Sequence, residues 1–496
     1  MTESANPGGA TLAREMGLSG LVATGVCAMV GAAINVIPFM IQRNVPGIGA
    51  SVLPAYLLGA IPALFAAMAY AILASAMPRA GGSYVYASRA LSPYPGFVAS
   101  FSQWFSLCIA IGVVAYLLVP FIRDVAVAAG ASGLAAGLES GAARLGIPLA
   151  VLWTFVGVNL RGIGAYQRTV VPLMFLTLFL GALVIVAGFS FGHADFIRAV
   201  PEAAAAVAAA RTPAAAPPQI VLASVLLFSS FIGFDTIAQA GGEARDAART
   251  VPLAIGIAIV GVAAFYFLFT AAVYHAVPWP WVAEQARGQD LTAPGLLAPL
   301  LPRPLTVLMV SGAAVALMKD LPAMLLGTSR LMFAWAEDGI FPAAVARVHP
   351  VRRTPDVAVI ASGGMATAGI LGSHLAGDFF LGVDILVISM LINFLLMSLA
   401  VLTLPGRSPA LAAAVRVVPG RSAQVALASA GVIVIGLFLA VHVWRDLRAD
   451  TAWYFRSTAL WVVMLAAASA IYWRERRLLV RRGVDVAARF STLPPQ

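Results

Sequence analysis

Long apolar runs, separated by short polar stretches, set the first limit on how this chain can fold. Of its 496 residues 61% are hydrophobic and only 10% are charged, whereas soluble globular domains average roughly 25% charged residues. A helix needs about 20 apolar residues to cross the hydrocarbon core of a bilayer. Runs of about this length lie at residues 18–41, 50–77, 97–121, 145–160, 170–191, 219–240, 252–277, 304–334, 357–374, 379–404, 423–443 and 453–473. The sequence therefore predicts an all-α polytopic membrane protein with twelve transmembrane helices.

The charges predict how these spans are oriented. The net charge is +10, and the arginines concentrate in the stretches that lie inside the cell if both termini are cytoplasmic. Because cytoplasmic loops carry such an excess, we expect residues 1–17 and the basic residues 474–496 to be cytoplasmic tails of a multi-pass protein in the cell inner (plasma) membrane. Contact with anionic lipid explains the basic tail better than nucleic-acid binding does, and the first residues lack the pattern of a signal peptide.

Two of the apolar runs are interrupted near their middles by small and polar residues. The first interruption runs from Val30 to Asn35 (VGAAIN), and the second runs from Ser229 to Asp235 (SSFIGFD). A broken helix is tolerated within a bilayer only where protein or a water-filled cavity satisfies the freed N–H and C=O groups. Two breaks at corresponding places in two halves of a chain indicate a secondary transporter that holds its substrate between them.

Four stretches of the chain resemble motifs of the amino acid-polyamine-organocation (APC) transporters. The stretch from Met77 to Ser92 resembles the signature between the second and third spans of that family, and Met29 to Ile34 resembles its first-span glycine motif more loosely. Residues 231–252 are similar to the sixth-span motif, and residues 329–355 are similar to the end of the eighth span. The resemblance is to a bacterial amino acid permease, and it implies transport by alternating access.

The resemblance also implies how the chain is divided. Spans 1–5 at residues 18–191 form a first repeat and spans 6–10 at residues 219–404 form a second, inverted one, joined by an outer loop at residues 192–218. Spans 1 and 6 are expected to be discontinuous. Two extra helices follow at residues 405–473, outside this five-plus-five inverted repeat.

In such a transporter, N–H groups at the first break receive the carboxylate of an amino acid, and carbonyl groups at the second break receive its ammonium. The charges fit, since a half-helix carries partial positive charge at its N-terminus and partial negative charge at its C-terminus. The candidate substrate-binding residues are Gly31, Ala32, Ala33, Ile34, Ser229, Phe231, Ile232, Gly233 and Phe234. The alternative that the glycines only let helices pack closely stays open.

Two departures from the family pattern bear on the substrate. Ala33 stands where the family usually has a second glycine, and its methyl group crowds the carboxylate site, so a polyamine or other organocation carrier is the closest alternative. Ser229 stands where many members carry a gating aromatic. Either the neighbouring Phe228 replaces that aromatic, or the pocket is roomier there.

Ionisable residues within the spans are the candidates for proton coupling, because a charge at a helix centre costs about 2.5 to 3.5 kcal/mol on insertion scales. Asp235 directly follows the second break and resembles an acidic residue linked to proton sensing in related exchangers, although a cap for the broken backbone explains it equally. Asp384, near the outer end of the tenth span, is better explained by solvation or packing.

Lys319 is the only lysine of the chain and lies in the eighth span. Proton-coupled family members often carry a lysine in the fifth span, at a position that Thr177 occupies here. We therefore hypothesise that Lys319 supplies this cation from the eighth span, paired with Asp320, with Asp235 or with a carbonyl group of the first break. Asn35 and Thr177 complete the candidate coupling residues, and a structural ion pair is the alternative role for Lys319.

Other classes of protein receive less support from the residues. The spans contain no HExxH or GxSxG motif and no paired His or Cys, so we expect neither an enzyme nor a metal or cofactor site. Cys27 and Cys108 lie within apolar spans and are interpreted as small core residues. The predicted partners are a small amino acid or amine, protons and the lipid bilayer, without a defined oligomeric state. A sensor that binds an amino acid without transporting it stays open.

Overall fold

The computed structural model describes residues 12, 14–210, 215–288, 291–376 and 380–494, apart from the side chains of Ala32, Ala376, Phe380 and Ala487. Nearly all of this part is helical, and its β pairing is one isolated bridge between Met16 and Ala244. Eleven stretches within it are long and apolar enough to cross a membrane. The prediction of an all-α polytopic membrane protein is therefore confirmed.

Six helices occupy the first five predicted spans, because the first span consists of two helices separated by a break. In chain order they are α1 (Leu18–Met29), α2 (Ala32–Asn44), α3 (Val52–Ala76), α5 (Pro93–Ala128), α7 (Gly141–Leu160) and α8 (Ile163–Ser190). Short helices connect them: η1 (Gly49–Ser51), α4 (Gly82–Ala90) and α6 (Ser132–Leu138). Each of these five spans thus lies close to its predicted position.

The sixth span is broken into short pieces, whereas the next four are continuous. The pieces are α11 (Pro217–Leu227), η2 (Phe228–Phe231), α12 (Thr236–Gln239) and η3 (Ala240–Glu243). The continuous helices are α13 (Ala247–Ala276), α16 (Arg303–Glu337), α17 (Asp356–Ala376) and α18 (Phe380–Arg407). The connecting helices are α9 (His193–Ala199), α10 (Glu202–Ala209), α14 (Trp279–Gly288), α15 (Ala293–Leu297), η4 (Ala298–Leu300) and η5 (Ala343–Ala346).

Two further long helices follow the tenth span. They are α20 (Arg421–Arg448) and α21 (Ser457–Arg481), with the short helices α19 (Pro409–Ala413), η6 (Trp453–Phe455) and α22 (Val486–Ser491) around them. The eleventh of the candidate spans is α20. Helix α21 lies where the sequence predicts the twelfth span but is not among the eleven candidates, so that twelfth crossing stays a prediction.

The two broken spans are the most enclosed of the bundle. In the most apolar window of each span, 88% of the residues are buried in α1–α2 and 83% in the span from Pro217 to Glu243, compared with 33% in α8 and 28% in α20. Helix α16 packs against α1, α5, α8 and α17, and α13 packs against α1, α3 and α8. Neighbouring helices therefore shield both breaks from lipid, which is the condition under which a bilayer tolerates them.

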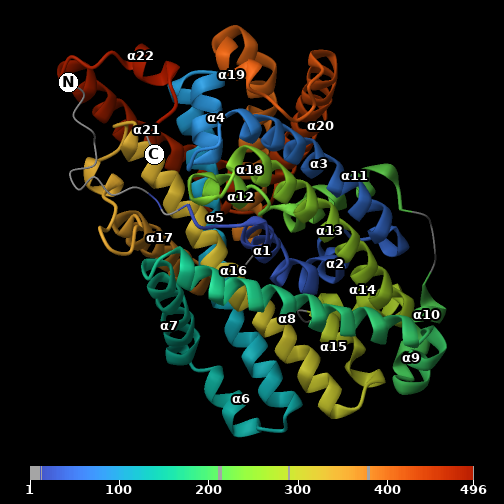
Figure 1. Ribbon diagram of the computed structural model, residues 1–496. Helices are drawn as coiled ribbons and strands as arrows, with labels where there is room; N and C mark the ends of the chain where they lie inside the picture. The colour runs from blue at the N-terminus through green and yellow to red at the C-terminus, as the bar shows by residue number, and fades with distance from the viewer. Residues whose placement is uncertain (1–11, 13, 211–214, 289–290, 377–379, 495–496) are drawn as a thin grey trace.

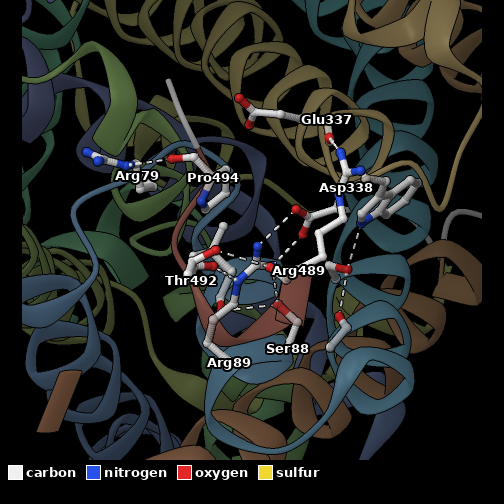
Figure 2. Close-up of polar contacts among 12 residues, drawn as sticks. Arg79, Ser88, Arg89, Glu337, Asp338, Arg489, Thr492 and Pro494 are labelled. Carbon is white, nitrogen blue, oxygen red and sulfur yellow. Dashed lines mark hydrogen bonds and ion pairs between the residues drawn. The ribbon is translucent and has the colours of Figure 1, made fainter. Parts of the chain in front are cut away.

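The two ends of the bundle carry different short helices (Figure 1). Helices α4, α19 and α22 lie at one end, which we call the α4 end, and α6, α9 and α10 lie at the opposite end. The C-terminal segment from Val486 to Pro494 packs on the α4 end and is held there by arginine side chains (Figure 2). The hydrogen bonds run from Arg79 to the Pro494 carbonyl (3.1 Å), from Arg89 to the Thr492 carbonyl (3.1 Å) and from Arg489 to the Glu337 carbonyl (2.8 Å).

Candidate functional site

The first break is short. Helix α1 ends at Met29 and α2 begins at Ala32, so only Val30 and Gly31 lie outside helical structure. The predicted interruption is therefore confirmed, although Asn35 at its far end lies within α2, where its amide donates to the Gly31 carbonyl at 3.2 Å. The break exposes two oppositely polarised helix ends: the carbonyl end of α1 and the N–H end of α2.

The ammonium group of Lys319 lies at the carbonyl end of α1. Its side chain is fully buried, and Nζ donates to the Cys27 carbonyl at 3.2 Å and to the Val30 carbonyl. It also forms an ion pair with Oδ1 of Asp320 at 2.9 Å. An ammonium group has three protons, so these three oxygens match its donors. Two of the three partners considered from the sequence, Asp320 and a carbonyl of the first break, are thus found together.

The carboxylate of Asp320 lies against Gly31, beside the N–H end of α2. A Cβ atom on residue 31 would lie 2.7 Å from Oδ1 of Asp320 and still nearer to Oδ2. Real Cβ atoms essentially never make contacts this short, so a side chain at residue 31 would force the Asp320 carboxylate to move. The side chain of Ala32, the next residue, lies outside the described part of the chain.

The second break is longer and packs on the first. Helix α11 ends at Leu227, η2 follows as a 3-10 turn, and Ile232 to Asp235 form turns before α12 begins. Gly233 has a φ of +135°, a conformation that glycine adopts at little cost. A Cβ atom there would lie 2.6 Å from the backbone of Ala28, so the second break touches the last turn of α1.

Asp235 belongs to a different group of side chains from Lys319. Its buried carboxylate accepts from the Gly233 N–H at 3.1 Å and from the side-chain amide of Gln103 on α5. The amide oxygen of Gln103 accepts in turn from Gln239 at 2.8 Å and from Ser83 at 2.6 Å. The contact with the Gly233 N–H makes Asp235 a hydrogen-bond partner of the broken backbone, although its side chain makes no cap bond to α12.

A cavity lies between the two breaks. It holds about 670 Å³ of space, including solvent at its mouth, and its walls come from α1, α2, α5, η2, α16 and α18. Among its described lining residues the polar side chains are Asp320 and Ser229, and the others are apolar or glycine. The arrangement therefore offers an organic molecule apolar walls, one carboxylate and one hydroxyl group.

Three of the nine predicted substrate-binding residues line this cavity: Ala33, Ser229 and Ile232. Phe228 is fully buried and packs on Phe394, with ring centroids 6.0 Å apart. Of the two alternatives for the missing aromatic, the arrangement thus corresponds to the roomier pocket, because Ser229 and not Phe228 faces the space.

The remaining predicted residues are not among the described lining residues of this cavity. Phe231 packs edge-on against Tyr56, Phe234 stacks on Phe394, and Gly31 and Gly233 make the close backbone approaches described above. Ile34 faces a second, smaller cavity on the other side of α2, between α8, α13 and α16. The structure thus brings residues of both breaks together around one cavity. Gly31 and Gly233 permit close contacts of the backbone and do not line that cavity.

Two predicted coupling residues, Asn35 and Thr177, meet at the second cavity. The hydroxyl of Thr177 is buried without a hydrogen-bond partner among the described residues. Helix α16 contributes to both cavities: Gly312 and Ala316 line the second, whereas Asp320, one turn after Ala316, lines the first.

Sequence reasoning missed two residues at the site. Gln103 binds Asp235, and the only sequence signal for it is a glutamine inside the apolar third span. Tyr266 on α13 donates its hydroxyl to the Met29 carbonyl at 2.5 Å and so caps the end of α1. A tyrosine in an apolar run gives little warning of such a contact.

The charged residues of the family-like motifs lie outside the cavity. Arg330 forms a two-pronged ion pair with Glu243, at 2.9 and 2.5 Å, and both side chains are buried. Arg89 forms a similar pair with Asp338 (Figure 2). These pairs tie the end of the sixth span, α4 and the end of α16 to one another.

Comparison with known proteins gives one consistent result. A family model described as amino acid permease matches residues 17–468. The branched-chain amino acid permease BcaP of Bacillus subtilis (strain 168) is 29% identical over 212 residues, which are 40% of this chain and 42% of that protein. The low-affinity putrescine importer PlaP of Escherichia coli (strain K12) is 26% identical over 297 residues, 59% of this chain and 60% of that protein.

A third match, over a shorter stretch, is the vacuolar cationic amino acid transporter 4 of Arabidopsis thaliana, which is 29% identical over 149 residues, 30% of this chain and 24% of that protein. The matched stretch thus covers less than two thirds of each of these three relatives. The family match, in contrast, runs over nearly the whole chain and includes both breaks and the cavity between them. The chain therefore belongs to the amino acid permease family of APC transporters, and it is a transporter rather than an enzyme.

Proposed function

We propose that this protein carries an amino acid or a closely related amine across the plasma membrane by alternating access. The observation that carries the proposal is the pair of interrupted spans, which touch each other at Gly233 and Ala28 and face one cavity. Interrupted helices expose partial charges that suit a small charged substrate. Because both spans are shielded from lipid, these charges act on neighbouring protein groups and on a molecule that enters the cavity.

The positions of the two interruptions in the chain support the five-plus-five inverted repeat. The interruptions fall in the first and the sixth span, so each opens a set of five: α1 to α8 in one set and α11 to α18 in the other. Helices α20 and α21 lie outside both sets. With both tails in the cytoplasm, as the arginines predict, the α4 end faces the cytoplasm and α9 and α10 face outward.

We further propose that protons drive this transport, with Lys319 and Asp235 as the coupling residues. The Lys319 ammonium joins α16 to the end of α1 through the Cys27 and Val30 carbonyls. Loss of its proton would weaken those contacts, so its charge is linked to the position of α1. Asp235 joins the second break to α5 through Gln103 in a comparable way. Asp320 is the ion-pair partner in this scheme, and Asn35 and Thr177 line the neighbouring second cavity.

Counterflow in proteoliposomes tests the transport function. Vesicles that contain the purified protein are loaded with an unlabelled amino acid or amine and diluted into a trace of the same compound in labelled form. A transporter concentrates the label inside the vesicles, whereas protein-free vesicles do not. A sensor built on this fold would bind the compound, seen as a rise in melting temperature, without accumulating the label, and that result would overturn the proposal.

A carrier of polyamines or other organic cations is the second candidate. The specific observation in its favour is that the ionisable side chain lining the cavity, among the described residues, is a carboxylate, that of Asp320. The similarity to a putrescine importer, alongside that to a branched-chain amino acid permease, is consistent with either candidate.

A further inference from the structure

The C-terminal segment from Val486 to Pro494 joins the two sets of five spans at the α4 end (Figure 2). On the first set, two of its carbonyl groups accept hydrogen bonds from Arg79, which precedes α4, and from Arg89 on α4. On the second set, its own Arg489 donates to the Glu337 carbonyl at the end of α16, at 2.8 Å. A segment that belongs to neither set thus bridges both.

The same segment covers an ion pair that also joins the two sets. Arg89 of α4 binds Asp338, the residue after α16, and their side chains are 0% and 4% exposed. Phe490 of the segment lies on the Arg89 guanidinium, with its ring centre 4.9 Å from the central carbon, and the Thr492 carbonyl accepts from Arg89. Two charges attract each other more weakly where water reaches them. Departure of the segment therefore weakens the link between α4 and α16.

The cavity lies toward the opposite end of the bundle. Its lining residues on α18 are Gly382, Val383 and Leu386, in the first two turns of that helix. The other end of α18 lies at α4, because Ser408, the residue after α18, donates to the Arg89 carbonyl at 3.0 Å. The two buried ion pairs described above and the C-terminal segment are all on the α4 side of the cavity. This conformation is therefore closed at the α4 end.

We propose that the C-terminal segment is a strap that holds the α4 end closed, and that its release limits how fast this end opens. Alternating access moves one set of spans against the other, so contacts that join both sets at one end have to break before that end opens. The segment makes such contacts itself and shields the ion pair between Arg89 and Asp338. This inference rests on the proposed transport function and adds a controlling step to it.

Counterflow by the full-length chain and by a chain that ends at Gly483 tests the proposal. The labelled probe is whichever compound the full-length chain accumulates from a panel of the protein amino acids and putrescine. Opening of a closing element often limits turnover, so we expect the shorter chain to exchange the probe about threefold faster or more, as a modest population shift gives. Its melting temperature should fall at the same time. A segment that only stabilises the fold would instead lower the exchange rate together with the melting temperature.

Two arginine variants separate the segment from the rest of the basic tail. Arg489→Ala removes the hydrogen bond to the end of α16 and keeps the segment, so we expect it to exchange the probe about twofold faster or more. Arg482→Ala is the matched control, because it removes an exposed arginine that precedes the segment. It should exchange at the rate of the unaltered chain. These two variants decide the question if the shorter chain does not fold.

The possible outcomes separate this inference from the proposed function. If the shorter chain exchanges the probe at the full-length rate or more slowly, the transport function stands and the segment is not a strap. An equal acceleration by Arg482→Ala and Arg489→Ala would also overturn the proposal, because the effect would then come from the charge of the tail. If the full-length chain accumulates no compound of the panel, the proposed function fails and this inference fails with it.

Discussion

The ammonium group of Lys319 on α16 is hydrogen-bonded to the carbonyl oxygen of Val30, the residue that follows the last turn of α1. This contact places the single lysine of the chain at the break of the first span. It also separates Lys319 from Asp235, whose carboxylate is bound by Gln103 and by the Gly233 N–H. If both residues take part in coupling, they act at different breaks and through different neighbours.

The role of Lys319 is tested by its pH dependence. Lys319→Arg and Lys319→Ala are expected to change how uptake varies with pH, because neither variant can release and recover the same proton at this position. Lys319→Ala also leaves the Asp320 carboxylate without its cation, which costs about 3 to 5 kcal/mol for a buried pair. Uptake across a pH series and the melting temperature measure the two effects.

The outcome that removes Lys319 from coupling is a wild-type pH dependence in both variants. The double variant Lys319→Ala with Asp320→Asn serves as the control for stability. It should melt at a higher temperature than Lys319→Ala alone, because no uncompensated charge remains buried.

Gly31 is predicted to tolerate no side chain. In Gly31→Ala the new methyl group would overlap the Asp320 carboxylate, so the carboxylate or the break has to move, and we expect uptake to be lost and the melting temperature to fall. Gly256→Ala is the control: Gly256 lies in α13, where a methyl group would meet no neighbouring atom within 4 Å, and this variant should keep full uptake. Normal uptake by Gly31→Ala would show that the close contact at Gly31 has no functional importance.

The occurrence of both breaks could be predicted from the sequence, but their lengths could not. Small and polar residues in the middle of an apolar span indicate an interruption wherever it falls. The first interruption nevertheless covers only Val30 and Gly31, because residues from Ala32 onward return to helix and Asn35 bonds back to the Gly31 carbonyl. The carbonyls of Gly31 and Val30 accept from the side chains of Asn35 and Lys319, and the second of these contacts comes from a distant helix that no local pattern reveals.

The partners of the buried polar groups were harder to predict than the groups themselves. Lys319 and Asp235 are visible as charges in apolar spans, yet the Gln103 that binds Asp235 lies 132 positions away along the chain. Such contacts depend on how α5 packs beside the second break, which no local pattern encodes. Likewise, Ser229 faces the cavity while Phe228 packs on Phe394, and both lie in the 3-10 turn η2, whose geometry the sequence does not reveal.

The buried ion pair between Glu243 and Arg330 is predicted to matter more for stability than an exposed pair of the same kind. Glu243→Gln leaves a buried guanidinium without its carboxylate, at a cost of about 3 to 5 kcal/mol. Glu139→Gln is the matched control, because Glu139 pairs with Arg123 at the surface, where solvent screens the interaction. Thermal unfolding should show a large fall for the first variant and none for the second. Equal melting temperatures would refute a structural role for the buried pair.

The C-terminal segment is predicted to stabilise the α4 end. Phe490 is 5% exposed and lies under the Arg89 guanidinium, 4.9 Å from its ring centre. A chain that ends at Gly483 lacks this contact and the carbonyl acceptors of Arg79 and Arg89 (Figure 2). We expect a lower melting temperature for that chain, and a smaller fall for Phe490→Ala, which keeps the backbone acceptors. A truncated chain with the same melting temperature as the full-length chain would contradict this account.

The most direct test of the central claim is a density map of the full-length protein with a saturating concentration of an amino acid or amine that drives counterflow. The account predicts helices interrupted at Gly31 and Gly233, with ligand density in the cavity between Ala33, Ser229 and Asp320. Continuous helices through both positions, without ligand density between them, would contradict it.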